Sequence, residues 1–507
     1  MTHFLERYKE KIAGKLSCFD RVVVTGTLLD ICYPDSMSFF LRHRNIRIFD
    51  YAQWAAPLRE KIRENAEKLA SEHNVKIQFV RRSNEDKEKM VAKIVSERGE
   101  APGLIAIVSA MERCPTYEPW HDKKTHQTYL RYDEAKCLHY YFYFILKDWG
   151  LCYLRVPTWA PFRLQFYFNG HNALAALLRK NGVGFKMADN SFVEIEDWDK
   201  AQRLADSLAP QALHRLLDQL ARVYCPVVRE FSQGYHWSLM QAEYSTDVVF
   251  RKQSDLAPLY EEMSRTAIHT VKPDKVATFL GRKINGNFTA EVGNRFNTRI
   301  EGTCIRHTLD SASIKMYDKF HLVLRIETTV NDASFFKHYR KVEHRDGTDD
   351  MKVAPVKKSI YSLPILRQLM GSSNERYLEF IAAIDDPSAS HKDLDKISRP
   401  VRDGERSSRG FNFFHGGDAE IFRTLLRGEF AISGFRNQDL RRHFETCSSH
   451  ETSRLLRRLR VHGMIKKIVN THKYYLTKFG RRIGVMALKI KEMFMIPTLR
   501  GLTTTGS

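Results

Sequence analysis

Hydrophobic and polar positions follow two different periods along the first 200 residues. The apolar, strand-like runs are 21–28, 46–51, 75–80 and 103–110. The charged stretch 57–73 between them carries apolar residues at helical spacing. Aromatic-rich runs at 139–146 and 151–156 predict a hairpin, and 162–168 predicts a further strand. This rhythm predicts a mixed α/β domain over residues 1–200.

The period becomes helical beyond residue 200 and then returns to alternation. Residues 210–223 and 255–268 predict amphipathic helices. The alternating runs that follow are 297–307, 313–319 and 321–330, and they predict an antiparallel meander. A helical stretch at 361–384 comes next. We therefore predict a second domain, residues 201–385, built from helices and a meander.

The last quarter of the chain has its own pattern. Residues 386–412 are rich in Pro, Ser, Gly and charge, and they predict an interdomain linker. In the domain predicted beyond it, 413–507, short helices are expected at 435–444 and 450–461. Two strands of a hairpin are expected at 464–470 and 473–477. The fold class expected for the whole chain is multidomain α+β.

Composition adds a strong positive charge to this picture. The 507 residues carry a formal net charge of +21, and residues 441–507 hold fifteen Lys and Arg against three Glu. A concentrated basic segment is typical of a domain that binds phosphates. At 43% hydrophobic residues, general disorder is excluded.

Other features of the sequence indicate where the protein acts. No apolar run approaches the length of a membrane span, and the amino terminus lacks the apolar core of a secretory signal. Eight scattered cysteines suit a reducing compartment. We therefore expect a cytoplasmic protein with reduced thiols and no membrane partner.

The run LLRRLRVHGMIKKIVNTHKYYLTKFGRR resembles the winged helix-turn-helix superfamily, over about residues 431–496. The resemblance implies that the second helix enters the major groove of duplex DNA and that the hairpin contacts the backbone or the minor groove. The residues expected to bind nucleic acid are Ser449, Thr452, Arg454, Arg457, Arg458, Lys466, Lys467, His472, Lys473, Arg481 and Arg482.

Polar residues on one face of the predicted meander are candidates for phosphate chemistry. Alternation places Lys315 and Tyr317 on one face of their strand, and Arg325 and Glu327 on one face of the next. The preceding strand offers Arg299, Glu301 and His307. Phosphoryl chemistry needs cations that neutralise phosphate oxygens, groups that transfer protons and a hydroxyl nucleophile. The catalytic candidates are therefore Tyr317, Glu327, His307 and Arg325, and a solvated sheet face is the alternative.

Residues 313–327 are also similar to a segment of phage and plasmid rolling-circle replication proteins. Those proteins carry a tyrosine-aspartate-lysine turn before a strand that ends in Arg-Ile-Glu, as IKMYDKFHLVLRIE does here. The similarity implies a nucleophilic role for Tyr317. The His-hydrophobic-His metal motif of those proteins does not occur in this chain.

Two further groups of residues are candidates for metal binding. Cys114, His121, Cys137 and His139 lie within 26 residues and offer the four thiolate and imidazole ligands of a structural Zn²⁺. Their spacing matches no standard zinc finger, and ordinary core cysteines with surface histidines are the alternative. Asp20 lies beside the first strand-like run and Glu112 lies just beyond the run that ends at residue 110, and their convergence would resemble the carboxylates of RNase H-like nucleases.

These patterns together predict a nucleic-acid-binding protein. We expect a DNA-processing or mobile-element-associated protein that docks on double-stranded DNA, with Mg²⁺ or Mn²⁺ as cofactor if it is a nuclease. The alternatives are a noncatalytic transcriptional regulator with a large sensing or oligomerisation body, and an RNA-binding scaffold. Motifs for nucleotide binding and serine hydrolysis do not occur.

Overall fold

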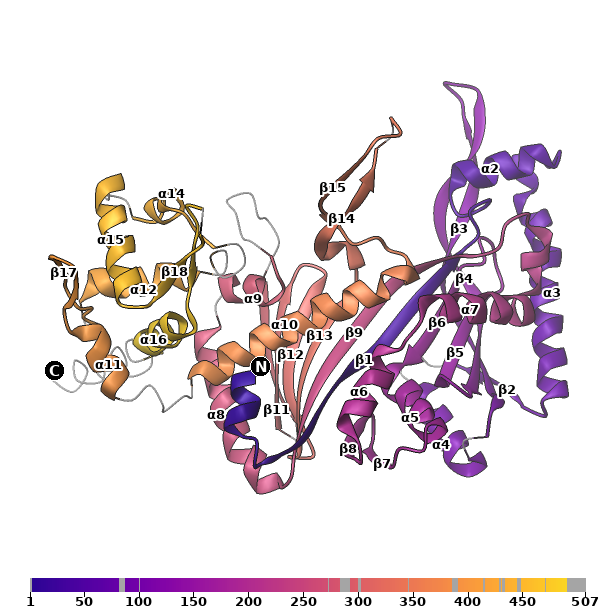
Figure 1. Ribbon diagram of the computed structural model, residues 1–507. Helices are drawn as coiled ribbons and strands as arrows, with labels where there is room; N and C mark the ends of the chain where they lie inside the picture. Colours follow the sequence, from indigo (N-terminus) through magenta and orange to yellow (C-terminus); the bar gives the residue numbers. More distant parts are fainter. Residues whose placement is uncertain are drawn as a thin grey trace, which may run out of the picture. The chain divides into compact units, whose positions relative to one another are not determined.

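The computed structural model describes residues 2–489 (Figure 1), except for 82–86, 100, 272, 283–291, 300–301, 345, 385–390, 414, 428–429, 431–433, 445–447 and 470. The fold is mixed α+β. It divides into two compact units, of which one comprises residues 16–245 and 329–368 and the other comprises 1–15, 246–328 and 369–507. Both units are discontinuous in sequence, so the boundary predicted near residue 200 falls inside the first of them.

The unit that contains residues 16–245 is built on a long first strand and an antiparallel meander. Its strands are β1 (Ile12–Thr27), β2 (Ile77–Val80), β3 (Gly103–Asp122), β4 (Gln127–Leu146), β5 (Gly150–Pro157), β6 (Leu164–Asn169), β7 (Phe185–Ala188) and β8 (Ser191–Ile195). The order in the main sheet is β1-β6-β5-β4-β3-β2, and β6 pairs antiparallel with β1. Many side chains of these strands are apolar and buried, and residues 104–110 of β3 and 139–145 of β4 are buried without interruption.

Helices and a second small hairpin complete this unit. The helices are α2 (Pro34–His43), α3 (Tyr51–Glu72), α4 (Lys87–Arg98), α5 (Gly170–Lys180), α6 (Trp198–Asp206) and α7 (Pro210–Tyr224), with short 3-10 turns at Ile48–Asp50, Pro226–Glu230, Ala333–Phe335 and Ile360–Ser362. The separate hairpin pairs β14 (Lys337–Glu343) with β15 (Asp349–Pro355).

The other unit repeats the plan of a long strand, helices and a meander. Its elements are α1 (Thr2–Arg7), α8 (Gln253–Thr270), α9 (Pro273–Phe279), β10 (Val292–Arg299), β11 (Gly302–Leu309) and β12 (Ala312–Lys319), together with parts of β9 (His236–Phe250), β13 (Val323–Val330) and α10 (Leu363–Ile384), which are divided between the two units. The strand order is β10-β11-β12-β13-β9. In both units the last meander strand therefore lies beside the long first strand, so the two units share one topology although the sequence shows no repeat.

Residues 391–489 form a small basic region with its own core. Its elements are α11 (His391–Ser398), β16 (Val401–Asp403), β17 (Arg406–Ser408), α12 (Gly416–Leu425), α14 (Asn437–Arg441), α15 (Ser449–Val461), β18 (Ile465–Lys467), β19 (Tyr474–Leu476) and α16 (Lys478–Lys489). The core packs Phe422, Phe435, Leu456, Leu459 and Ile483 together. Helix, turn, helix and hairpin follow one another in the predicted order.

Several expectations differ from the observed elements. Residues 46–51 form the 3-10 turn and the start of α3 rather than a strand, and 236–250, expected among helices, form β9. The strand predicted at 103–110 is longer than expected, because β3 continues to Asp122. In the predicted linker, α11 and a short hairpin form, and Ile397 and Phe411 join the C-terminal core. Among the described residues, no helix is long and apolar enough to cross a bilayer.

A buried ion pair joins β9 to β13. The Arg325 guanidinium donates to both carboxylate oxygens of Asp247, through Nε and Nη2, each at 2.6 Å. The side chains are 0% and 2% exposed. Two charges removed from water are stable only with such bidentate geometry, because their desolvation costs several kcal/mol each.

We expect the Asp247→Ala substitution to destabilise the protein by about 3–5 kcal/mol, because it leaves the charge of Arg325 buried and unpaired. The measurement is urea unfolding followed by intrinsic fluorescence. Glu194→Ala is the control, since it breaks the exposed Lys186–Glu194 pair and should cost less than about 1 kcal/mol. Equal losses for the two variants would contradict the importance of the buried pair.

Candidate functional site

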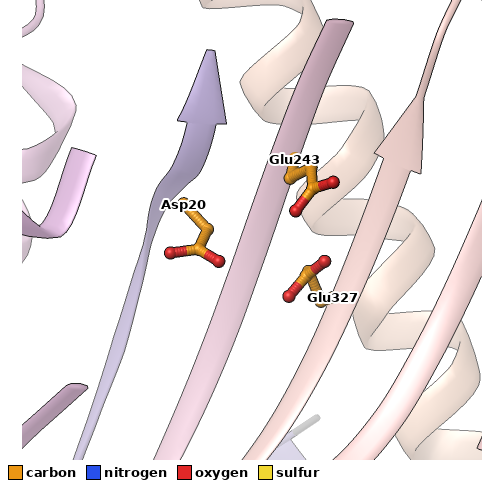
Figure 2. A group of neighbouring side chains, drawn as sticks. All are labelled: Asp20, Glu243 and Glu327. Atoms are coloured by element: carbon orange, nitrogen blue, oxygen red, sulfur yellow. The ribbon is translucent and has the colours of Figure 1, made fainter. Parts of the chain in front are cut away.

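Three carboxylates lie close together on neighbouring strands of the sheet. Asp20 on β1, Glu243 on β9 and Glu327 on β13 each offer one oxygen, and these oxygens lie within 4.8 Å of one another (Figure 2). Asp20 and Glu327 are buried and Glu243 is half-buried. Ionised carboxylates at this spacing repel one another, so they favour a bound cation or a shared proton.

Glu327 is held by two side chains from the adjacent strand β12. Lys315 Nζ donates to Glu327 Oε1 at 2.5 Å, and Tyr317 Oη donates to Oε2 at 2.8 Å. The side chain of Glu327 is 1% exposed and that of Lys315 is 13% exposed. The Glu327 carboxylate therefore forms an ion pair with Lys315 and accepts a hydrogen bond from the Tyr317 hydroxyl, which places an acceptor beside that proton.

Asp20 is contacted by two side-chain amides and a buried histidine. The side-chain amides of Asn169 and Asn190 donate to Asp20 Oδ1 at 3.2 and 3.0 Å, and His171 Nδ1 lies 3.0 Å from the same oxygen. Asn169 ends β6 and caps α5, where its own Oδ1 accepts from two backbone amides. The cap therefore fixes the amide that orients Asp20.

The carboxylates suit a hard divalent cation. Mg²⁺ and Mn²⁺ prefer oxygen ligands, and one or two carboxylates with water are a common ligand set for Mg²⁺. Asp20, Glu243 and Glu327 are the residues that would hold such an ion. Among the described residues, no other group of three His, Cys, Asp or Glu side chains brings ligand atoms this close.

Two of the four predicted catalytic residues join this group and two do not. Tyr317 and Glu327 meet as described, whereas Arg325 is committed to Asp247. His307 pairs in register with Ile314, so it projects from the face opposite Lys315 and Tyr317. There it lies 2.8 Å from Asn294 Oδ1 and 3.2 Å from Tyr377 Oη.

The catalytic prediction is therefore wrong for Arg325 and His307. Burial lowers the pKa of His307 to about 4, so this imidazole is neutral at physiological pH. Glu301 and the side chain of Arg299 lie outside the described residues.

The four residues predicted to bind zinc do not form one site. Cys114, Cys137 and His139 are buried together, and Cys137 Sγ lies 3.8 Å from His139 Nδ1. His121 lies seven residues along β3 from Cys114, which is about 23 Å of extended strand, and hydrogen-bonds Thr128. Burial, reinforced by the charge of Arg155, lowers the pKa of His139 to about 4. The extended hairpin of β3 and β4 keeps His121 away from Cys114, whereas a compact loop could have brought the two side chains together.

Glu112 does not converge with Asp20. It stands on β3, four strands from β1, a separation of about 19 Å. Lys87 donates to Glu112 Oε1 at 2.5 Å, Arg155 donates twice to Oε2, and the Tyr141 hydroxyl contacts both oxygens. Burial would raise the pKa of Glu112, but the hydrogen bonds from Lys87 and Tyr141 and the charge of Arg155 lower it to about 2.

The predicted nucleic-acid-binding residues of the C-terminal region differ in exposure. Ser449 and Arg454 on α15, Lys466 and Lys467 on β18, and His472 are exposed. Arg457, Lys473, Arg481 and Arg482 are half-buried. Of these, Arg457 contacts Asp403, Arg481 approaches Glu379, and Arg482 contacts Asp393.

Thr452 and Arg458 lie inside this region, so the prediction that they bind nucleic acid is wrong. Thr452 is 1% exposed, and its hydroxyl donates to the Ser448 carbonyl. Arg458 donates to both oxygens of Asp418, each at 2.9 Å, and stacks 3.7 Å above the ring of Phe411. It also donates to the carbonyls of Arg409 and Gly410, so it ties the segment before α12 to the middle of α15.

Sequence reasoning missed Glu243, Asn169 and Asn190. Glu243 lies on β9, where no strand was expected, and its alternation with buried Ala242 and Tyr244 is the signal that marks it. Asn169 and Asn190 reach Asp20 only through the fold, because they lie about 150 and 170 residues away along the chain.

Comparison of this chain with protein-family models, with curated proteins and with solved structures gave no match.

The low pKa of Glu112 predicts acid sensitivity of its unit. The folded-state pKa of about 2 lies below the ordinary value of 4.5, so the stabilisation is complete above pH 4.5 and is lost as the pH falls toward 2. It amounts to at most about 3 kcal/mol. We expect Glu112→Gln to reduce stability in urea unfolding near neutral pH, and the deficit to shrink in acid. A Glu118→Gln control should show no such trend, and a constant deficit for Glu112→Gln would contradict the assignment.

Proposed function

We propose that the chain binds duplex DNA through a winged helix-turn-helix formed by residues 416–489. The order α12, α14, α15, β18-β19 and α16 supports this assignment. An isolated bridge between Phe435 and Tyr474 adds a third short strand to the hairpin. Asn437 donates to the Ser449 carbonyl and to Ser453 Oγ, which fixes the angle between α14 and α15.

One observation carries this proposal: α15 and β18 turn a cationic face outward. Leu456 and Leu459 of α15 pack into the core, while Arg454 and Arg460 are exposed to solvent. Lys466 and Lys467 extend the exposed charge onto the hairpin. Cations presented by a helix and the wing beside it suit the phosphates that flank a major groove.

The start of α15 adds to this surface. Ser448 and Glu451 form a capping box, in which each side chain accepts from the backbone of the other. The box satisfies backbone amides at the end of the helix that carries positive partial charge. Ser449 and Ser453 stand exposed beside it with hydroxyls that suit phosphate or base edges.

A second activity, cleavage of a phosphodiester strand, is favoured by the carboxylate group. Asp20, Glu243 and Glu327 would hold a divalent cation, and such an ion polarises phosphate oxygens and lowers the pKa of bound water. Lys315 supplies a cation for charge that develops on the phosphate. Tyr317 offers a hydroxyl beside a proton acceptor, which supports the covalent route that the replication-protein similarity implies.

We expect Arg454→Ala to weaken binding to a short mixed-sequence duplex by about 1–2 kcal/mol and to lower the salt slope of log affinity by about 1, because it removes one cation from the DNA-facing side. Fluorescence anisotropy across a salt series measures both. Arg458→Ala is the matched control. Because the Arg458 side chain makes buried contacts, this substitution should lower the thermal stability of the protein. Lys123→Ala, an exposed cation on the β3-β4 turn, should leave affinity unchanged. If Arg454→Ala binds like wild type, the winged-helix proposal fails.

We expect Mn²⁺- or Mg²⁺-dependent cleavage of labelled DNA by the wild-type chain, reduced about 100-fold or more in Glu327→Gln. Glutamine keeps the shape and can still accept from Lys315, so thermal melting should show a folded variant. Glu343→Gln, an exposed carboxylate on β14, is the control. A protein–DNA adduct that disappears in Tyr317→Phe would assign Tyr317 as nucleophile. If the chain binds duplex DNA but cleaves no strand with any metal, the result would favour the noncatalytic regulator.

A further inference from the structure

Three cations stand in a row across the meander strands, on the face that carries Glu327. Arg295 on β10 is directly opposite Arg306 on β11, and Arg306 is directly opposite Lys315 on β12. Directly paired residues of antiparallel strands project from the same face. Lys315 then contacts Glu327 on β13. The row therefore runs from the edge strand to the carboxylate group.

Like charges at directly opposed positions destabilise a sheet. Some directly opposed positions elsewhere carry opposite charges, as in the pairs Lys186–Glu194 and Glu118–Arg131. In two other directly opposed pairs of cations, one cation forms an ion pair with a nearby carboxylate. Arg113 does so with Glu134 in one pair, and Lys352 does so with Asp350 in the other.

Arg295 and Arg306 lack this compensation within the described part of the chain. Both are exposed, and neither forms an ion pair with a described carboxylate. Lys315 contacts Glu327, but its partner across the strands is again a cation. The repulsion along the row is relieved when an anion binds over it.

The spacing of the row favours a polymer of phosphates over a single anion. Neighbouring strands lie about 4.8 Å apart, so the three backbone positions span about 10 Å. The arginine fork matches phosphate oxygens in bidentate geometry. The inner end of the row meets Tyr317 and Glu327, the groups suited to phosphodiester chemistry.

We propose that Arg295, Arg306 and Lys315 bind the phosphodiester backbone of a nucleic-acid strand across β10–β12 and lead it toward Glu327. The inference rests on the proposed function only in taking nucleic acid as the partner. It adds a second contact, separate from the C-terminal helices. The strand has to be open to follow the sheet face to the carboxylates, so single-stranded DNA or RNA is the expected ligand.

The test uses the full chain with both exposed arginines replaced, Arg295→Gln and Arg306→Gln together. Affinity for labelled single-stranded oligonucleotides should fall about tenfold or more, and the salt slope should fall by about 1.4, since each lost contact with a single strand removes about 0.7. Lys123→Gln with Lys124→Gln removes the same charge from the β3-β4 turn and should change neither value. Parallel DNA and RNA arms identify the strand, and poly-glutamate serves as a competitor.

A stability measurement separates binding from a structural role. Because the substitutions relieve like-charge repulsion, the double variant should melt at the same temperature as wild type or about 1–3 °C higher. A lower melting temperature with unchanged single-strand affinity would overturn the proposal, and so would poly-glutamate binding that exceeds nucleic-acid binding. Failure of the winged-helix proposal would be seen in a separate measurement, because Arg454→Ala would then bind duplex DNA with the affinity of wild type.

Discussion

The buried pair of Asp247 and Arg325 is the constraint on which the candidate site depends. Two charges without water are tolerated only in one geometry, so the bidentate contact sets β13 in a single register against β9. Glu327 lies two residues beyond Arg325 on the same face, and Glu243 lies four residues before Asp247 on its strand. A one-residue slip of β13 would turn Glu327 to the opposite face, away from Glu243. The ion pair thus specifies position more than it adds stability.

Local pattern predicted the C-terminal region well because its elements are specified by neighbours in the sequence. The Ser448–Glu451 cap, the apolar spacing of α15 and the short turn between β18 and β19 act over a few residues. The same holds for Tyr317 and Glu327, which lie on consecutive strands joined by a tight turn. Alternation alone was enough to bring these two together.

Contacts between distant parts of the chain were not predictable in this way. Whether His307 faces Tyr317 depends on the pairing of β11 with β12, and a shift of one residue reverses the answer. Arg458 reads as a surface cation at helical spacing, yet its partner Asp418 lies 40 residues earlier and draws it into the core. Glu243 was missed because β9 lies in a stretch whose period was predicted to be helical. Pairing and burial are set by the whole fold.

The shared strand order of the two units places a comparable contact at the same point in each. In each unit an aspartate on the long first strand meets a polar residue on the last meander strand, Asp20 with Asn169 and Asp247 with Arg325. Arginine neutralises its partner, whereas the amide orients a carboxylate without cancelling its charge. At this point one copy of the plan holds a buried ion pair, and the other holds a carboxylate oriented by an amide. The counter-charge at this point therefore differs between two units that follow the same strand order.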